Sequence, residues 1–261
     1  MTTQSPANDA SNSVGETPVA LITGSGTGVG RACALRFAKL GYRVVVNYSR
    51  SGKEAEATAA ELREQGTACL CIAADVSSEE AVSAMMNRVE SEFGRLDALV
   101  NNAARTHFIP LSNLDAMSSE KWDQLIAVNT KGPFFCVRAA AKMLAAGKGG
   151  SVVNVSSVAG QTGRGSCVAY AASKGALNTL TKSLAVALAP KIRVNAVLPG
   201  PIDSRWIRDG DNDWDLNEMT ESFPLPRAST PDEIADGVLF LATGTAMTTG
   251  QLLVVDGGQT L

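Results

Sequence analysis

Short apolar runs alternate with longer stretches of helical periodicity from Pro18 to the end of the chain. The apolar runs are rich in Val, Ile and Leu and nearly continuous, which is typical of strands covered by helices on both faces. Alternation of such strands with helical segments predicts βαβ units that build a parallel sheet. The predicted strands are Val19–Thr23, Arg43–Tyr48, Ala68–Ala73, Leu96–Asn101, Ser151–Ser156, Arg193–Leu198 and Leu252–Val255.

Helices are predicted between these strands, and the pattern runs without a Pro/Gly-rich linker. The last helix has Thr230 as its N-cap, Pro231 in its first turn and Glu233 as the capping-box partner. We therefore predict an α/β fold, a doubly wound, Rossmann-type parallel sheet of seven strands with helices on both faces, in a single domain over residues 18–261. The predicted helices are residues 29–40, 51–65, 78–93, 118–146, 169–189 and 231–242.

Residues 1–17 are rich in Ser, Asn, Thr and Pro and show no apolar periodicity, which predicts a flexible tail. The formal net charge of −3 provides no basic surface for nucleic acid or an anionic membrane, so a small-molecule partner is expected. No run approaches the roughly 18 apolar residues of a membrane span, and signal-peptide features are missing, so we expect a cytoplasmic protein. Five cysteines without a CxxC pair and a single histidine, His107, favour no metal site.

A glycine-rich loop, Gly24-x-x-x-Gly28-x-Gly30, joins the first predicted strand to the first helix. Missing side chains would let backbone N–H groups and a helix N-terminus approach a pyrophosphate. The spacing differs from G-x-G-x-x-G, so a tight turn without a ligand is the alternative. The position between an apolar strand and an amphipathic helix favours a nucleotide site, with Thr27 and Val29 as further contacts.

The end of the second predicted strand lacks the Asp or Glu that reads the ribose 2′-hydroxyl of NAD. Tyr48, Ser49 and Arg50 stand there instead, and hydroxyl groups with a guanidinium suit the 2′-phosphate of NADP(H). NAD(H) is the less favoured cofactor. The alternative is that Arg50 is a solvated surface residue and that Glu54 or Glu56 reaches back to the ribose.

Ordered motifs make the chain resemble the short-chain dehydrogenase/reductase family, in its shorter single-domain branch, over essentially all of residues 18–261. The chain departs from the family pattern at Ala104, where Gly is usual, and at Ser204, where Thr is common. The matching motifs are Thr23-Gly24-x-x-x-Gly28-x-Gly30, Asp75-Val76, Asn101-Asn102-Ala103, Asn129, Ser157, Tyr170-Ala171-Ala172-Ser173-Lys174, Pro199-Gly200 and Val255-Asp256-Gly257-Gly258.

Tyr170 and Lys174 stand four residues apart, which places them one turn apart on the same face of a helix. Carbonyl reduction by a nicotinamide needs an acid that protonates the developing alkoxide. A phenol with a pKa near 10 needs a neighbouring cation to favour its charged form, and a shift of ~3 units represents roughly 4 kcal/mol. We therefore predict that Lys174 lowers the pKa of Tyr170 and also reaches the nicotinamide ribose.

Ser157 stands thirteen positions before Tyr170, which is the family's spacing, and follows the fifth predicted strand. Its hydroxyl would hold the substrate oxygen, with the adjacent Ser156 as the alternative. The resemblance implies that Asn129 holds a water linking Lys174 to solvent. From chemistry alone, Asn129 would instead satisfy backbone groups in a bent helix.

The resemblance implies further cofactor contacts beyond the glycine loop. Asp75 and Val76 would meet the adenine, and Asn102 and Ala103 the adenosine ribose. Without the family, Asp75 would be the N-cap of the next helix. Pro199-Gly200-Pro201-Ile202 is a rigid turn suited to placing backbone groups against the nicotinamide amide, and Ser204 follows it.

Three segments are expected to form the rim of the pocket, because connections at the carboxyl ends of strands carry specificity. They are Arg105–His107, Gln161–Val168 and Ser204–Phe223. We expect residues 203–223 to form a mobile lid, with Trp206 and Trp214 as apolar covers.

The sequence thus predicts an NADP(H)-dependent oxidoreductase acting on a carbonyl or secondary alcohol, resembling 3-oxoacyl-carrier-protein reductases. One alternative is an NAD-dependent dehydrogenase of a sugar, steroid or other alcohol. Another is a catalytically silent dinucleotide sensor, against which the joint presence of Ser157, Tyr170 and Lys174 argues. The resemblance also implies a homotetramer assembled through the helices near 118–146 and 169–189.

Overall fold

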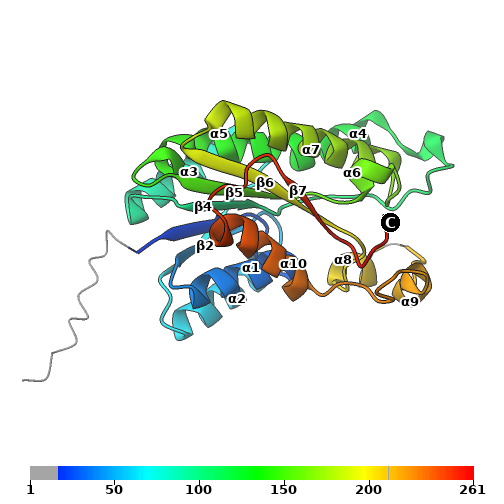
Figure 1. Cartoon of the computed structure of the whole chain (residues 1–261), viewed down its shortest axis with the longest axis horizontal. Helices are drawn as coiled ribbons and strands as arrows, with labels where there is room; N and C mark the ends of the chain where they lie inside the picture. Colours follow the sequence, from blue (N-terminus) through cyan, green and yellow to red (C-terminus); the bar gives the residue numbers. More distant parts are fainter. Residues whose placement is uncertain (1–16, 211) are drawn as a thin grey trace, which may run out of the picture.

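Seven parallel strands form one sheet in the order β3-β2-β1-β4-β5-β6-β7, in a computed structural model that describes residues 17–210 and 212–261 (Figure 1). The prediction of a doubly wound sheet is confirmed. The predicted tail of residues 1–17 lies, apart from Thr17, outside the described residues. The strands are β1 (Val19–Ile22), β2 (Arg43–Tyr48), β3 (Cys69–Ala73), β4 (Ala98–Asn101), β5 (Gly150–Val155), β6 (Ile192–Pro199) and β7 (Leu252–Val255).

Helices cover both faces of the sheet and enclose an apolar layer on each side (Figure 1). Successive residues of β1 serve opposite layers, because side chains alternate along a strand: Ala20 and Ile22 face α1, and Val19 and Leu21 face α5. One face carries α1 (Gly28–Lys39), α2 (Gly52–Glu64) and α10 (Pro231–Leu239). The other carries α3 (Glu79–Phe93), α5 (Gly132–Ala145) and α7 (Val168–Leu188).

The predicted helix 118–146 is interrupted. It consists of α4 (Ser119–Ile126), a π-helical turn η2 (Ala127–Lys131) and α5. The predicted helix 231–242 likewise ends in a π-helical turn, η3 (Phe240–Gly244), after α10. A π turn adds only one residue to the helical repeat, a change too small to stand out in the apolar pattern of the sequence.

Four short elements have no counterpart in the sequence prediction, because pieces this short carry no periodic signal. The cap of α9 is Asp215, which accepts hydrogen bonds from the backbone N–H groups of Asn217 and Glu218. The elements are η1 (Leu114–Ala116), α6 (Ala159–Thr162), α8 (Arg205–Arg208) and α9 (Leu216–Thr220).

Two cap predictions have different outcomes. The capping box of α10 is present, with Thr230 and Glu233 accepting from each other's backbone N–H groups. The alternative that Asp75 caps α3 is wrong. Ser78 is that cap, and Asp75 instead accepts from the backbone and hydroxyl of Ser77 within a turn.

The strand order reverses between β1 and β4, so the connections after these two strands leave the sheet in opposite directions. A crevice at the carboxyl ends of the strands is expected at such a point, and ligands of open α/β sheets bind there. Within the described part of the chain, no helix has both the length and the apolarity needed to cross a bilayer.

Candidate active site

The glycine loop has the backbone geometry that its sequence predicts. Gly24 and Gly28 have φ of 63° and 55°, the left-handed region that glycine adopts readily. A Cβ on Gly30 would come within 2.4 Å of the Gly24 carbonyl oxygen, so Gly30 permits close packing of α1 on the loop. A Cβ on Gly28 would meet nothing within 4 Å and would occupy open space beside the loop.

Buried amides and a hydroxyl hold this loop in place. Asn47 Oδ1 accepts from the backbone N–H of Gly24 (3.2 Å), and Asn102 Nδ2 donates to the carbonyl oxygens of Thr23 and Gly24 (2.9 and 3.0 Å). Thr23 Oγ1 accepts from the backbone N–H groups of Asn102 and Ala103, both at 3.0 Å. Asn47 was missed by the sequence reasoning, and its signal is a polar residue within the otherwise apolar strand β2.

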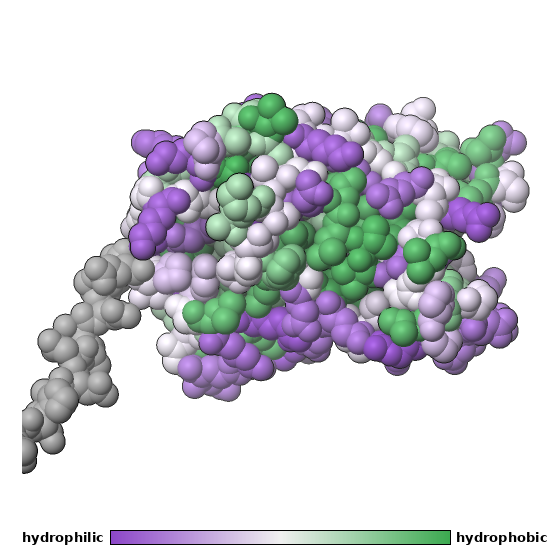
Figure 2. All heavy atoms as spheres, viewed as in Figure 1, coloured by the Kyte–Doolittle hydropathy of each residue, from purple (hydrophilic) through white to green (hydrophobic). Residues whose placement is uncertain are grey.

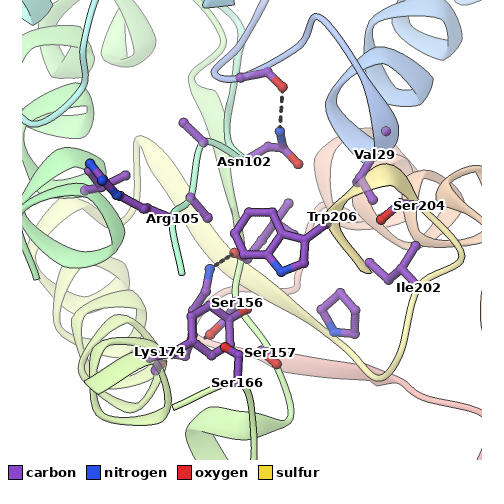
Figure 3. A pocket seen from close by; sticks show the side chains of 18 of the residues that line it. Val29, Asn102, Arg105, Ser156, Ser157, Ser166, Lys174, Ile202, Ser204 and Trp206 are labelled. Carbon is purple, nitrogen blue, oxygen red and sulfur yellow. Dashed lines mark hydrogen bonds between the residues drawn. The ribbon is translucent and has the colours of Figure 1, made fainter. Parts of the chain in front are cut away.

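The loop forms one wall of a cavity of about 790 Å³ at the carboxyl ends of the strands. Figure 3 shows Val29 and Asn102 on one side of this cavity and Ser157 and Lys174 on another. Most of the predicted site residues line it: Gly24, Thr27, Gly28, Val29, Ser49, Arg50, Asp75, Val76, Asn102, Ala103, Ser157, Tyr170, Lys174, Pro199, Gly200, Ile202 and Ser204.

Three predicted site residues do not line the cavity: Gly30, Tyr48 and Asn129. Gly30 serves the packing described above, and the ring of Tyr48 lies against Gly52 at the start of α2. The amide of Asn129 is fully buried in η2. It donates to the Arg105 carbonyl (2.9 Å) and to Ser173 Oγ (3.0 Å) and accepts from the Arg105 N–H (2.8 Å). Asn129 thus joins the loop after β4 to α7. It satisfies backbone groups, as the alternative interpretation expected, but these groups belong to Arg105 in the loop and not to the helix.

Ser157, Tyr170 and Lys174 come together at the carboxyl end of β5. Lys174 is 2% exposed, its Nζ donates to the Val155 carbonyl (2.8 Å), and it lies 5.7 Å from the centre of the Tyr170 ring. The Ser157 hydroxyl hydrogen-bonds with the Tyr170 phenol. The α7 helix therefore brings both its phenol and its amine to the wall of the cavity that Ser157 lines.

The hydroxyl of the adjacent serine, Ser156, already has a hydrogen-bond partner. Ser156 is buried, and its hydroxyl donates to Asn178 Oδ1 at 2.6 Å. Ser157 Oγ accepts from the backbone N–H of Ala159 (3.1 Å), and its hydroxyl lines the cavity beside the Tyr170 phenol with which it interacts. The geometry therefore favours Ser157 over Ser156 as the residue that meets a substrate.

The pKa values of the pair differ from the sequence expectation. Burial raises the pKa of Tyr170 to about 12, and the hydrogen bond with Ser157 opposes this only in part. Burial lowers the pKa of Lys174 to about 7. The predicted lowering of the tyrosine pKa is therefore wrong for this structure, because removal from water penalises the charged form of both groups.

A sulfur atom caps the helix that carries the pair. Cys167 is fully buried at the N-cap position of α7, and its Sγ accepts from the backbone N–H of Tyr170 at 3.4 Å. Its position just before the tyrosine helix was the signal for a cap, although Ser, Thr, Asp and Asn are the usual cap residues.

The ribose end of the cavity lacks a free carboxylate from α2. Ser49 and Arg50 line it, as predicted. Glu54 lies 3.1 Å from Arg205, and Glu56 lies 3.6 Å from Arg63. Both carboxylates of the alternative interpretation are thus bound to other groups.

The predicted rim segments surround the opposite end. Trp206 and Trp214 line the cavity, and Figure 3 shows Trp206 there. The Trp206 ring centre lies 6.3 Å from that of Tyr170, and the Trp214 ring packs edge-on against Phe108 with centres 5.2 Å apart. His107 does not line it, and its Nε2 is buried without a hydrogen-bond partner among the described residues. Within the predicted rim segment 204–223, residues 205–208 and 216–220 form the short helices α8 and α9.

These features fit a dinucleotide. The φ of Gly28 and the open space beside it allow close approach of a phosphate to the backbone, and α1 begins there without a side-chain capping bond from Thr27. The first N–H groups of a helix and its positive end then face an anion.

Comparison with known proteins agrees with this geometry. A family model described as "Enoyl-(Acyl carrier protein) reductase" matches residues 24–260. The "Granaticin polyketide synthase putative ketoacyl reductase 2" of Streptomyces violaceoruber is 43% identical over 244 residues, 93% of this chain and 96% of that protein. The 3-oxoacyl-(acyl-carrier-protein) reductase FabG of Staphylococcus aureus is 40% identical, over 93% of this chain and 98% of that protein.

A solved structure shares both sequence and fold. The "putative short-chain dehydrogenase/reductase from Burkholderia xenovorans" superposes with a TM-score of 0.87 and 41% identity, covering 94% of this chain and 98% of that one. The chain belongs to the short-chain dehydrogenase/reductase family, whose members are oxidoreductases acting on carbonyl and alcohol groups.

Proposed function

We propose that this enzyme reduces the 3-oxo group of an acyl thioester, with NADPH as the hydride donor. The observation that carries the proposal is that Ser157, Tyr170 and Lys174 line the same cavity as the glycine loop. The substrate class comes from the relatives, two of which are named as ketoacyl and 3-oxoacyl reductases.

The chain's own residues account for the proton chemistry. A reduced nicotinamide, when bound, supplies the hydride. The Ser157 hydroxyl donates a hydrogen bond to the substrate oxygen and fixes its position. Tyr170, neutral at pH 7, donates its proton to that oxygen as negative charge develops there. In its protonated form Lys174, whose Nζ lies 5.7 Å from the centre of the Tyr170 ring, stabilises the charge left on the phenol during the transfer, although burial outweighs this effect on the phenol at rest.

The ribose end supports NADPH. Ser49 and Arg50 line the cavity where a 2′-phosphate would lie, and a guanidinium binds phosphate through charge-assisted hydrogen bonds. Glu54 and Glu56, the candidate ribose ligands for NADH, are engaged with Arg205 and Arg63.

The test is steady-state kinetics of the purified enzyme with acetoacetyl-CoA and with an acetoacetyl carrier protein, each with NADPH and with NADH. We expect a higher kcat/KM with NADPH and turnover of both thioesters. Higher kcat/KM with NADH on a sugar or steroid alcohol would contradict the proposal. Absence of turnover with any ketone would favour the silent sensor.

We also propose a domain organisation and an assembly for this enzyme. Residues 18–261 would act as one catalytic domain, in a cytoplasmic homotetramer joined through α4, α5 and α7. The outer side of α7 carries small residues and Val186, which is 83% exposed. Such a surface suits close helix packing against a second copy.

A further inference from the structure

An arginine of the rim segment 204–223 pairs with a carboxylate that does not itself line the cavity. Arg205 is the first residue of α8 and lines the cavity. Its Nη1 lies 3.1 Å from Oε1 of Glu54, and its Nε lies 2.9 Å from Oδ2 of Asp209. Glu54 precedes Arg205 by 151 residues, so this contact joins the lid to the nucleotide-binding half of the fold.

Glu54 lies close in sequence to residues that line the cavity. It lies in the first turn of α2, whose preceding residues Ser49, Arg50 and Ser51 all line the cavity. This turn packs on the glycine loop: Thr58 Oγ1 donates to the Gly26 carbonyl at 3.1 Å, and the backbone N of Ala55 lies 3.0 Å from where a Cβ on Gly26 would be. Glu54 thus stands beside the segment proposed to bind the 2′-phosphate.

A carboxylate at this end of the cavity has two effects on the cofactor. It accepts hydrogen bonds from a ribose 2′-hydroxyl, which favours NADH, and it repels a 2′-phosphate, which disfavours NADPH. Both effects depend on whether the carboxylate is free or already bound to a cation.

We propose that Arg205 determines the preference for NADPH over NADH by binding Glu54 and keeping its carboxylate from the ribose. The inference rests on the proposed function, because it concerns the same cofactor site. While the pair is formed, the acceptor oxygen of Glu54 is occupied and its charge is compensated. Ser49 and Arg50 then interact with the 2′-phosphate without competition.

The side chains of Arg205 and Glu54 are 64% and 38% exposed, so the pair is a modest one. Exposed ion pairs are screened by solvent and change an equilibrium only by a few-fold. The expected effect is therefore a moderate shift in cofactor preference, with no loss of folding.

The test compares the ratio of kcat/KM for NADPH to that for NADH in the wild type, Arg205→Met, Glu54→Gln and the double variant. Arg205→Met should lower the ratio about three- to fivefold, since it releases Glu54. In the Glu54→Gln background the same substitution should change the ratio little, because no carboxylate remains to be released.

Arg208→Met is the matched control. Arg208 lies on the same helix with a side chain 65% exposed and pairs with Asp203, and it does not line the cavity. We expect Arg208→Met to have the same NADPH/NADH ratio of kcat/KM as the wild type. Thermal unfolding of each variant confirms that the fold is kept.

Two results would overturn the inference. If Arg205→Met lowers the NADPH/NADH ratio of kcat/KM equally in the wild-type and Glu54→Gln backgrounds, Arg205 acts on the cofactor itself. If Arg205→Met leaves this ratio unchanged, Arg205 has no role in cofactor preference. The wild-type ratio alone tests the proposed function. The change on substitution tests the role of Arg205, so the two failures are distinguishable.

Discussion

Lys174 is buried and Tyr170 is partly buried at the cavity wall on one turn of α7, and their chemistry depends on this environment as much as on their spacing. The spacing brings phenol and ammonium together, and exclusion of water then raises the pKa of the first and lowers the pKa of the second. A neutral phenol near a partly protonated amine suits a proton donor at pH 7.

Replacing Tyr170 by Phe removes only the phenolic hydroxyl. We expect kcat to fall about 10²- to 10⁴-fold, the usual contribution of a general acid, with the Kd for NADPH nearly unchanged. Stopped-flow turnover and fluorescence titration measure the two quantities. Tyr42→Phe is the control, because Tyr42 packs against Phe37 and does not line the cavity. A Tyr170→Phe enzyme with near-normal turnover would assign the acid to another group.

Lys174 makes the stability of the protein depend on pH. Its folded pKa is about 7, below the unfolded value of about 10.4, so between these values the unfolded chain binds a proton that the folded chain lacks. The free energy of unfolding should therefore rise with pH over this window, by at most about 1.4 kcal/mol per unit. Tyr170 opposes this only above pH about 10, since its pKa is raised.

Lys174→Met should remove this rise, so that urea unfolding at pH 7, 8 and 9 gives a flatter profile than the wild type. Loss of the hydrogen bond to Val155 adds an offset that does not vary with pH. Lys182→Met, at an exposed position of the same helix, should keep the wild-type profile. Parallel profiles for Lys174→Met and the wild type would show that Lys174 does not titrate in this range.

At the scale of elements, the glycine loop depends on its neighbours for its shape. Asn47 from β2 and Asn102 after β4 hold the backbone from two sides, and α1 approaches closely at Gly30. The interrupted helix α4-η2-α5 is a second example, because η2 turns Asn129 toward Ser173 of α7 and Arg105. Both depend on contacts between segments far apart in the sequence.

Gly28→Ala tests the proposed cradle. The substitution places a Cβ in the open space beside the loop and strains a backbone with φ of 55°, at a cost of roughly 1–2 kcal/mol. We expect the Kd for NADPH to rise about tenfold or more, a change of about 1.4 kcal/mol.

Gly66→Ala is a matched control for backbone strain. Gly66 has φ of 81°, a Cβ there would meet nothing within 4 Å, and it does not line the cavity. Calorimetry should show a similar loss of stability in both variants and weaker binding only in Gly28→Ala. Equal NADPH affinity in the two would place the phosphates elsewhere.

On the scale of the whole molecule, the sheet has helices on both faces and two edge strands, β3 and β7. Figure 2 shows apolar side chains gathered in the middle of the face viewed, where Figure 1 places β7. The outer side of α7 is another surface that a second copy could cover, and the proposed tetramer would use it.

Val186→Arg tests this assembly. Val186 is 83% exposed on α7, and a cation there would lose its hydration if helices of two copies packed together. We expect sedimentation velocity to show a species smaller than the wild type. Leu40→Arg, at the exposed end of α1, should sediment as the wild type. A wild-type protein that sediments as a monomer would contradict the proposal.

Local patterns in the sequence were sufficient for the seven strands, for the positions of the glycines and for the four-residue spacing of Tyr170 and Lys174. Each of these follows from residues that are neighbours along the chain, where strand and helix periodicity acts. The family motifs added Ser157, which stands next to Ser156 without a local reason to choose between them.

Only the tertiary structure decided the remaining features. The role of Asn129 in joining Arg105 to Ser173, the cap from Cys167 and the pairing of Glu54 with Arg205 depend on which distant segments meet. The direction of the Tyr170 pKa depends on how completely water is excluded around it. Neither long-range contact nor desolvation is encoded in spacing along the chain, because both arise when the helices close over the sheet.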